Sequence, residues 1–119
     1  MKYLLAFIPP DVLHRVRDAL ISQHIHGLSV SDARGFGQEH DTAHPEYREI
    51  PGAELTRKTR LEIVCHDEEV DRVLDALYAA AHTGHAGDGK VFVLPVLDAL
   101  RLKTGDRGPA ALGPPYEGN

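Results

Sequence analysis

The stretch KTRLEIVCHDEEVDRVLDALYAAA, residues 58–81, contains both kinds of periodicity on which the fold depends. Its first eight residues alternate between two faces, and the apolar face consists of Leu61, Ile63 and Cys65. The residues after Asp67, the expected N-cap, repeat apolar side chains at helical spacing: Val70, Val73, Leu74 and Leu77. The stretch therefore predicts a strand over 58–65 and then a helix that ends before Gly84.

The same succession of strand and helix is predicted at the start of the chain. Residues 2–8 are typical of a buried strand, which Pro9 and Pro10 close. Asp11 is the expected N-cap of an amphipathic helix over 11–23, and a second strand follows over 28–34. The first strand is apolar on both faces, so we expect the face without helices to be buried against another copy of the chain or under a loop.

A fourth strand is predicted over 91–94, and a short helix from Pro95 to Leu100. The resulting order βαββαβ, with right-handed crossovers, predicts an α+β ferredoxin-like sandwich over residues 1–105. The last fifteen residues contain seven Gly or Pro, so 106–119 is expected to be an irregular tail. The polar segment Gly37–Arg57 is long for a loop in so small a domain, and we expect a mobile arm there.

Composition excludes several classes of protein. A chain of 119 residues with 42% hydrophobic and 26% charged residues predicts one globular domain. A net charge of −5 argues against general nucleic-acid binding. We expect no signal peptide or membrane span, because the longest apolar run is short. The single cysteine, Cys65, excludes an internal disulfide and favours a cytoplasmic location.

A glycine-rich turn, Thr83-Gly84-His85-Ala86-Gly87-Asp88-Gly89-Lys90, lies between the second helix and the last strand. Glycines allow successive N–H groups to point at one phosphate, and Lys90 adds a positive charge. In an extended segment, Arg101 and Lys103 would project to the same side. The alternative is an ordinary tight turn with a solvated lysine. A second glycine pair, Gly35-Phe36-Gly37, is either a turn or the other wall of a nucleotide pocket.

Other kinds of chemistry have weaker support in the sequence. Eight histidines include the pair His40 and His44, which can bind a metal ion or can simply be solvated on the arm. No set of catalytic residues is evident, and Cys65 on an apolar face is expected to be an inert core residue. We therefore expect a protein that is not an enzyme.

Taken together, these segments resemble the P-II signal-transduction family. The resemblance depends on Gly35-Phe36-Gly37, on Lys58 with Leu61-Glu62-Ile63-Val64, on the glycine-rich turn with Val91-Phe92-Val93, and on Arg101-x-Lys103-Thr104-Gly105. These pieces have the family's spacing from Met1 to Gly105.

The resemblance implies a homotrimer of ferredoxin-like subunits that binds ATP, ADP or AMP in the clefts between neighbours, without a permanently bound cofactor. The adenine and ribose side would consist of Gly35, Phe36, Gly37, Glu62 and Val64. The phosphates would be held by Gly87, Asp88, Gly89 and Lys90, and the adjacent subunit would contribute Arg101 and Lys103.

The effector implied by the resemblance depends on the residues after Gly37. Relatives that sense 2-oxoglutarate carry Gln directly after a Gly-Phe-Gly-Arg stretch, whereas this chain has Gln38 and Glu39. Glu39 can bind Mg²⁺ beside ATP, but its carboxylate would repel a dianion, and Lys58 remains as an anion partner. We therefore expect a smaller anion such as bicarbonate. The alternatives are a 2-oxoglutarate- and ATP-sensing nitrogen regulator and a metal-responsive trimeric relative.

The arm would carry the signal to a protein target, a transporter or an enzyme. The tyrosine that some relatives uridylylate aligns with Pro51, and Tyr47 lies four residues away. The arm sequence has little likeness to the family, so it does not identify the target.

Overall fold

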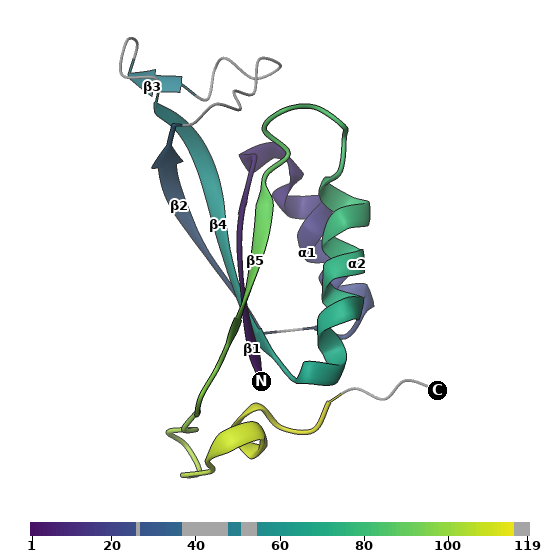
Figure 1. Ribbon diagram of the computed structural model, residues 1–119, viewed down its shortest axis with the longest axis vertical. Helices are drawn as coiled ribbons and strands as arrows, with labels where there is room; N and C mark the ends of the chain where they lie inside the picture. Colours follow the sequence, from purple (N-terminus) through teal and green to yellow (C-terminus); the bar gives the residue numbers. More distant parts are fainter. Residues whose placement is uncertain (26, 37–47, 51–54, 116–119) are drawn as a thin grey trace.

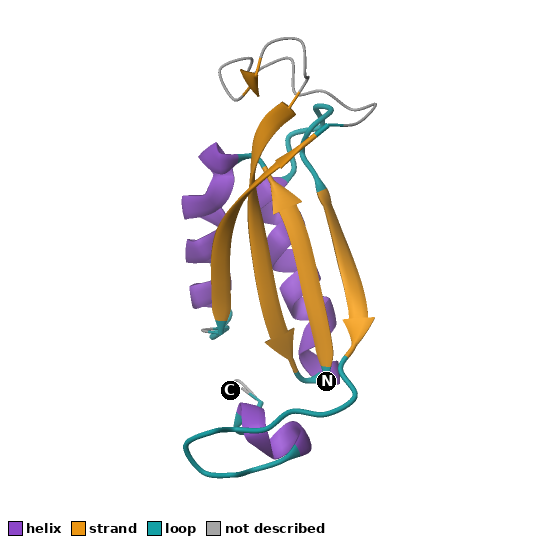
Figure 2. Cartoon of the chain, turned by 90° about the vertical axis from the view of Figure 1, so that its left-hand side faces the viewer, coloured by secondary structure: helices purple, strands orange, loops and turns teal. Residues whose placement is uncertain are grey.

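The computed structural model describes residues 1–25, 27–36, 48–50 and 55–115. The four main strands are β1 (Lys2–Ile8), β2 (Leu28–Gly35), β4 (Leu55–Cys65) and β5 (Lys90–Pro95). They form one sheet in the order β2-β4-β1-β5, and each neighbouring pair is antiparallel. Two helices, α1 (Leu13–Ser22) and α2 (Val70–Ala81), cover one face of this sheet, as Figures 1 and 2 show. The predicted α+β ferredoxin-like sandwich is confirmed.

The core lies between the sheet and the helices, on the face that alternation predicted. Antiparallel pairing places Leu4 beside Ile63 and Ala6 beside Leu61, so their side chains share the helix-facing side. Twelve buried apolar residues form one cluster: Leu4, Ala6, Ile8, Val12, Val16, Leu20, Ile25, Leu61, Ile63, Cys65, Val73 and Leu77. Within the described residues, no helix combines the length and hydropathy needed to cross a membrane.

The opposite face of the sheet carries no helix (Figure 2). Its β1 residues Tyr3, Leu5 and Phe7 are only half-buried, and Phe92 and Leu94 of β5 are 50% and 43% exposed. Apolar side chains gathered on an open sheet face are typical of an interface. The expectation that another copy of the chain covers this face stays a prediction.

Both helices begin differently from the sequence prediction. Pro10 opens a 3-10 turn, η1 (Pro10–Val12), so Asp11 lies inside that turn and Val12 precedes α1. His66, not Asp67, is the cap before the turn η3 (Asp67–Glu69), since the Glu69 carboxylate accepts the His66 N–H at 3.0 Å. The Asp67 carboxylate instead accepts a hydrogen bond from the amino group of Met1 at 2.8 Å and pairs with the ammonium of Lys2 at 3.2 Å.

The chain after β5 also departs from prediction, because residues 96–100 form no helix. The N–H of Val96 donates to the carbonyl of Met1 at 3.1 Å, and this bond keeps the chain extended beside β1. The tail expected to be irregular contains a 3-10 helix, η4 (Gly108–Leu112). The carbonyl of Gly113, directly after η4, lies 2.6 Å from Nε2 of His66.

The predicted arm over 37–57 is partly strand. A short strand, β3 (Arg48–Ile50), pairs antiparallel with β4, which begins at Leu55 and not at residue 58. The other arm residues, 37–47 and 51–54, lie outside the described part of the chain. The predicted mobility of the arm is therefore untested.

Leu61→Ala tests the assignment of the core. Leu61 is 0% exposed in the middle of β4, so its truncation leaves a cavity and is expected to lower the free energy of unfolding by about 2–5 kcal/mol. Urea denaturation followed by circular dichroism measures the change. The control is Arg17→Ala on α1, whose side chain is 60% exposed, and a change within about 0.5 kcal/mol is expected there. Equal losses in the two variants would contradict the core assignment.

Candidate functional site

The glycine-rich loop between α2 and β5 has a backbone that glycine alone accommodates. Gly84, Gly87 and Gly89 have φ values of 85°, 97° and 103°, in the region that side chains disfavour. At Gly89, a Cβ atom would lie 1.9 Å from the carbonyl oxygen of Phe7 in β1. The loop is therefore held against the end of β1 by close backbone contact, and its conformation is compatible with the predicted phosphate cradle.

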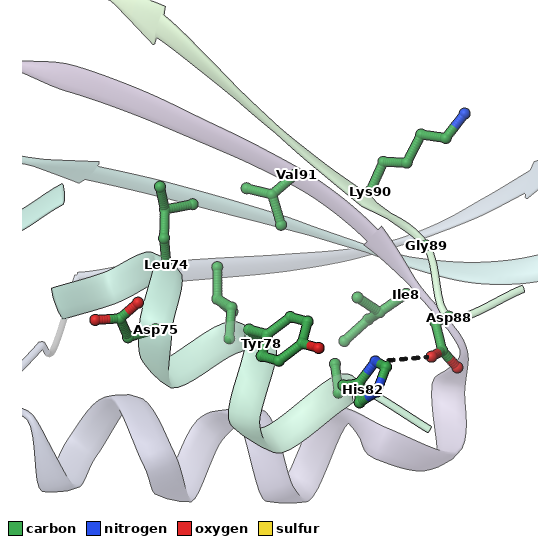
Figure 3. Close-up of a pocket in the computed structure, with 11 residues that line it drawn as sticks. Ile8, Leu74, Asp75, Tyr78, His82, Asp88, Gly89, Lys90 and Val91 are labelled. Carbon is green, nitrogen blue, oxygen red and sulfur yellow. Dashed lines mark ion pairs between the residues drawn. The ribbon is translucent and has the colours of Figure 1, made fainter. Parts of the chain in front are cut away.

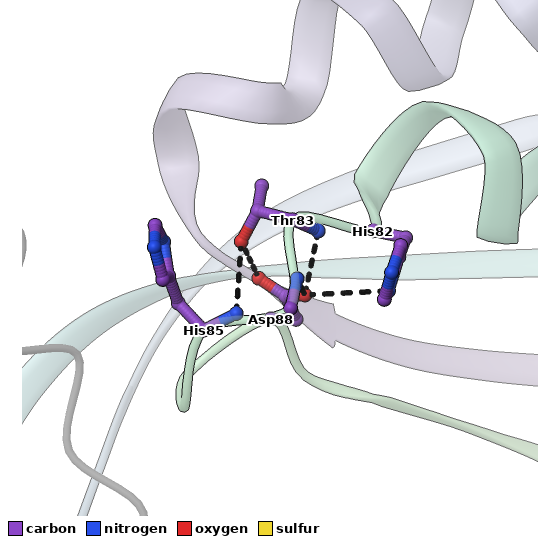
Figure 4. Close-up of polar contacts among 5 residues, drawn as sticks. His82, Thr83, His85 and Asp88 are labelled. Carbon is purple, nitrogen blue, oxygen red and sulfur yellow. Dashed lines mark hydrogen bonds and ion pairs between the residues drawn. The ribbon is translucent and has the colours of Figure 1, made fainter.

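The carboxylate of Asp88 organises this loop (Figure 4). One oxygen accepts the backbone N–H groups of Thr83 at 2.7 Å and Gly84 at 2.9 Å, and the other accepts the Thr83 hydroxyl. The N–H of Asp88 itself donates to the carbonyl of His85 at 3.3 Å. The assignment of Asp88 to phosphate binding stays a prediction. Its described contacts are with the loop itself and, at 3.8 Å, with His82, so the carboxylate shapes the loop.

Asp88 stays ionised at neutral pH. Partial burial opposes ionisation, but the hydrogen bonds from Thr83 and Gly84, together with the nearby His82, lower the pKa of Asp88 below its usual value. A charged acceptor makes the hydrogen bonds that shape the loop stronger than neutral ones.

Three basic residues lie on the open face of the sheet, near the glycine loop. Strand register places Lys90 and Arg60 on either side of Phe7, with Lys58 two residues before Arg60. The ammonium of Lys58 donates to the carbonyl of Gly87 at 3.3 Å. Lys90 is exposed and projects away from α2 in Figure 3. The predicted phosphate and anion partners therefore meet at one end of the sheet.

Glu62 lies on the same open face, two residues further along β4. The Tyr3 hydroxyl donates to Glu62 at 2.5 Å, and Nε of Arg60 lies 3.3 Å from the other carboxylate oxygen. The pKa of Arg60 is raised above its usual value by a hydrogen bond between its own side chain and Tyr3 and by the charge of Glu62. Register places Val64 beside Tyr3, where it is 38% exposed. Glu62 and Val64 thus share the open face with Lys90, as the nucleotide assignment requires.

The second glycine turn begins at the same end of the sheet. Gly35 ends β2, where it pairs with Thr56, and Phe36 after it is 76% exposed. The remaining predicted residues of this wall and of the effector and metal sites lie outside the described residues: Gly37, Gln38, Glu39, His40 and His44. In the described part of the chain, no three His, Cys, Asp or Glu side chains form a metal-binding group.

The basic pair Arg101 and Lys103 lies at the opposite end of β5 from Lys90. These residues are in a turn and not in the extended segment predicted, because the Gly105 N–H closes onto the carbonyl of Arg101 at 2.7 Å. At about 3.3 Å per residue, β5 alone separates its two ends by roughly 17 Å. The fold therefore does not bring Arg101 and Lys103 to the glycine loop of the same chain.

A hairpin presents this basic turn in a defined position. Leu100 and Arg107 form a β-bridge across it. The carboxylate of Asp98 accepts hydrogen bonds from the guanidinium of Arg107. It also accepts the backbone N–H groups of Ala99 at 2.8 Å and Gly108 at 3.2 Å. The Arg107 contact is the main cause of the lowered pKa of Asp98. The sequence indicated the two basic residues but not this hairpin, because an apolar run after Pro95 also fits a helix.

Two recesses near the glycine loop were not predicted. One, of about 460 Å³, lies between α2 and β5 behind the loop and has an apolar floor (Figure 3). The other, of about 500 Å³, is bordered by Arg34, Arg57 and Lys58, with Asp32 and Pro10. Arg34 and Arg57 are paired across β2 and β4, a contact that single-strand periodicity does not reveal.

Cys65 is buried in the core, as expected. Burial is the main reason that its pKa is raised from 9.0 to about 11. The thiol is therefore protonated at neutral pH and is a poor nucleophile.

Comparison with known proteins identifies the family. The family model described as nitrogen regulatory protein P-II matches residues 1–106. A nitrogen regulatory protein P-II from Azospirillum brasilense is 41% identical over 117 residues, covering 94% of this chain and 100% of the relative. One from Nostoc punctiforme is 38% identical over 112 residues, with 94% and 100% coverage. Nitrogen regulatory protein P-II 1 from Methanothermobacter thermautotrophicus is 39% identical over 113 residues, with 94% and 97% coverage. The chain therefore belongs to the P-II family of nitrogen regulatory proteins.

Proposed function

We propose that this P-II protein is a cytoplasmic sensor, not an enzyme, and that it binds ADP, AMP or ATP between the subunits of a homotrimer. The glycine loop and Lys90 of one subunit hold the phosphates, and Arg101 and Lys103 of the next subunit complete the site. Glu62, Val64, Gly35, Phe36 and Gly37 form the side that takes the ribose and adenine. The bound nucleotide sets the state of the arm, which acts on a protein target such as a transporter or an enzyme.

The distance between Lys90 and the basic pair Arg101 and Lys103 is the main support for this proposal. Lys90 lies at one end of β5, and the hairpin with Arg101 and Lys103 extends beyond the other end, at the bottom of Figure 1. Both basic residues are exposed, and the turn that carries them is closed by its own backbone hydrogen bonds, from the N–H of Gly105 to the carbonyl of Arg101 and from the N–H of Arg101 to the carbonyl of Asp106. A hairpin that cannot reach its own loop is suited to reach the loop of a neighbour.

The open face of the sheet supplies the surface for such a neighbour. Tyr3, Leu5 and Phe7 are half-buried there beside the exposed Phe92 and Leu94. Leu97 and Leu102, at and near the hairpin, are 96% and 90% exposed. Burial of these side chains between subunits would supply the hydrophobic free energy of assembly and would bring the hairpin to the adjacent open face.

A small anion such as bicarbonate is the proposed second effector. Lys58 contacts the carbonyl of Gly87 and borders the recess that contains Arg34 and Arg57. Arg34 and Arg57 lie opposite each other across β2 and β4 beside Lys58, and arginine and lysine side chains bind small anions through charge-assisted hydrogen bonds. Because Lys58 contacts both the recess and the loop, an anion there would influence nucleotide binding.

Lys90→Ala tests the phosphate assignment. Loss of a charged hydrogen bond to phosphate is expected to weaken ADP binding by about 1–3 kcal/mol, measured by isothermal titration calorimetry. Arg15→Ala on the exposed surface of α1 is the control and is expected to bind ADP as the unmodified protein does. Unchanged affinity in Lys90→Ala would refute the assignment.

A mixing experiment tests whether the site is shared between subunits. Gly89→Ala disrupts the loop, and the double variant Arg101→Ala/Lys103→Ala removes the basic pair, so neither protein alone is expected to bind ADP. In a ring of three, each mixed trimer regains one site, in which the intact loop meets an intact hairpin. Co-expression with two different tags, followed by calorimetry, should therefore restore about one site per mixed trimer. A complete site within one chain predicts no recovery, and that result would exclude the shared arrangement.

The choice of effector is tested by calorimetry with ADP, AMP and ATP, each with bicarbonate or 2-oxoglutarate. Bicarbonate is expected to increase nucleotide affinity about fivefold or more, the usual lower range of coupling between sites, and Lys58→Ala should abolish the increase. Sodium chloride at equal ionic strength is the control. If 2-oxoglutarate and not bicarbonate increases nucleotide affinity, the bicarbonate proposal is wrong and the protein is a 2-oxoglutarate-sensing nitrogen regulator.

A further inference from the structure

His82 occupies a fixed position between α2 and the glycine loop. It follows Ala81, the last residue of α2, and its backbone is extended. Its ring stacks on the ring of Tyr78, with centroids 4.6 Å apart and planes inclined by 17°. Both rings border the recess behind the loop (Figure 3). The helix therefore holds the imidazole beside the loop, even though its side chain is 50% exposed.

The imidazole faces the carboxylate that shapes the loop (Figure 4). Nδ1 of His82 lies 3.8 Å from the Asp88 oxygen that accepts the N–H groups of Thr83 and Gly84. This distance is too long for a hydrogen bond, so the ring acts on Asp88 through its charge. A protonated His82 attracts the carboxylate, whereas a neutral ring does not.

Among the charged groups around His82, the attraction between His82 and Asp88 is the one expected to change near neutral pH. Asp75 of α2 and Lys90 of β5 border the same recess, and His85 lies in the loop itself. Asp88 is ionised throughout the range around neutral pH, because its pKa lies below the usual value, and lysine keeps its charge far above pH 8. Histidine is the side chain that ordinarily changes charge between pH 5 and 8.

We propose that His82 is a positioning residue that makes nucleotide affinity respond to pH. When protonated, it secures Asp88, and through Asp88 the N–H groups of Thr83 and Gly84, in the conformation that receives phosphate. This inference rests on the proposed function, since the loop is taken to bind the nucleotide.

The test compares ADP affinity at pH 5.5 and pH 8 in four proteins: the unmodified chain, His82→Gln, His82→Arg and His14→Gln. The nucleotide and the loop sequence are the same in all four proteins, so the comparison is directed at His82. His82→Gln is expected to lose about two- to fivefold in affinity relative to the unmodified chain at pH 5.5 and little at pH 8, the range for an exposed ion pair. His82→Arg keeps a cation at both values, so it should bind more tightly than the unmodified chain at pH 8. His14→Gln, on α1, should match the unmodified chain throughout.

Nuclear magnetic resonance without nucleotide tests the same contact independently. The chemical shift of the Gly84 amide should change between pH 5 and 8 in the unmodified chain. This change should be absent in His82→Gln. If ADP does not bind at any pH while Gly84 titrates as expected, the proposed function fails and the contact stands. If ADP binds with the same pH profile in the unmodified chain and in His82→Gln, the inference is wrong. Equal losses in the Gln and Arg variants at both pH values would show a structural role only, and would also overturn it.

Discussion

The close contact between Gly89 and β1 is the constraint on which the candidate site depends. The carbonyl oxygen of Phe7 occupies the place where a side chain at residue 89 would begin, 1.9 Å from an ideal Cβ atom. This contact sets the point at which the chain enters β5, and the register then places Lys90 beside Phe7 on the open face. A larger residue at position 89 would move the loop away from the sheet, and with it the backbone groups suited to phosphate.

The loop also depends on an ionised side chain that makes no described contact outside it except with His82. Asp88 accepts the N–H groups of Thr83 and Gly84, directly after the end of α2. The same carboxylate lies beside the ring at the end of that helix. Core packing positions α2, α2 positions His82, and His82 and Asp88 together connect the core to the loop. A regulatory protein needs connections of this kind, because its output depends on small free-energy differences between loop conformations.

Much of the fold and part of the site could be predicted from local patterns. Alternation of Leu61, Ile63 and Cys65 with Arg60, Glu62 and Val64 correctly separated the core face of β4 from its open face. The helix stripe through Val73 and Leu77 was equally clear. Predictions failed where a contact between distant parts of the chain overrode a local rule. Asp67 has the chemistry of a cap, yet it pairs with Lys2 of β1, and the apolar residues after Pro95 follow β1 because Val96 donates to Met1.

The sequence by itself determined the order of elements, the core face of each, the residue types at the glycine loop and the family resemblance. All of these are properties of consecutive residues or of their spacing, and alternation and helical repeats follow directly from backbone geometry. Only the tertiary structure decided that Asp88 faces its own loop, that His82 lies beside it, and that Arg34 opposes Arg57. It alone placed Lys90 and Arg101 at opposite ends of β5. These relations depend on strand register and on which of several polar partners comes within reach, and a register is set by packing between segments distant in the chain.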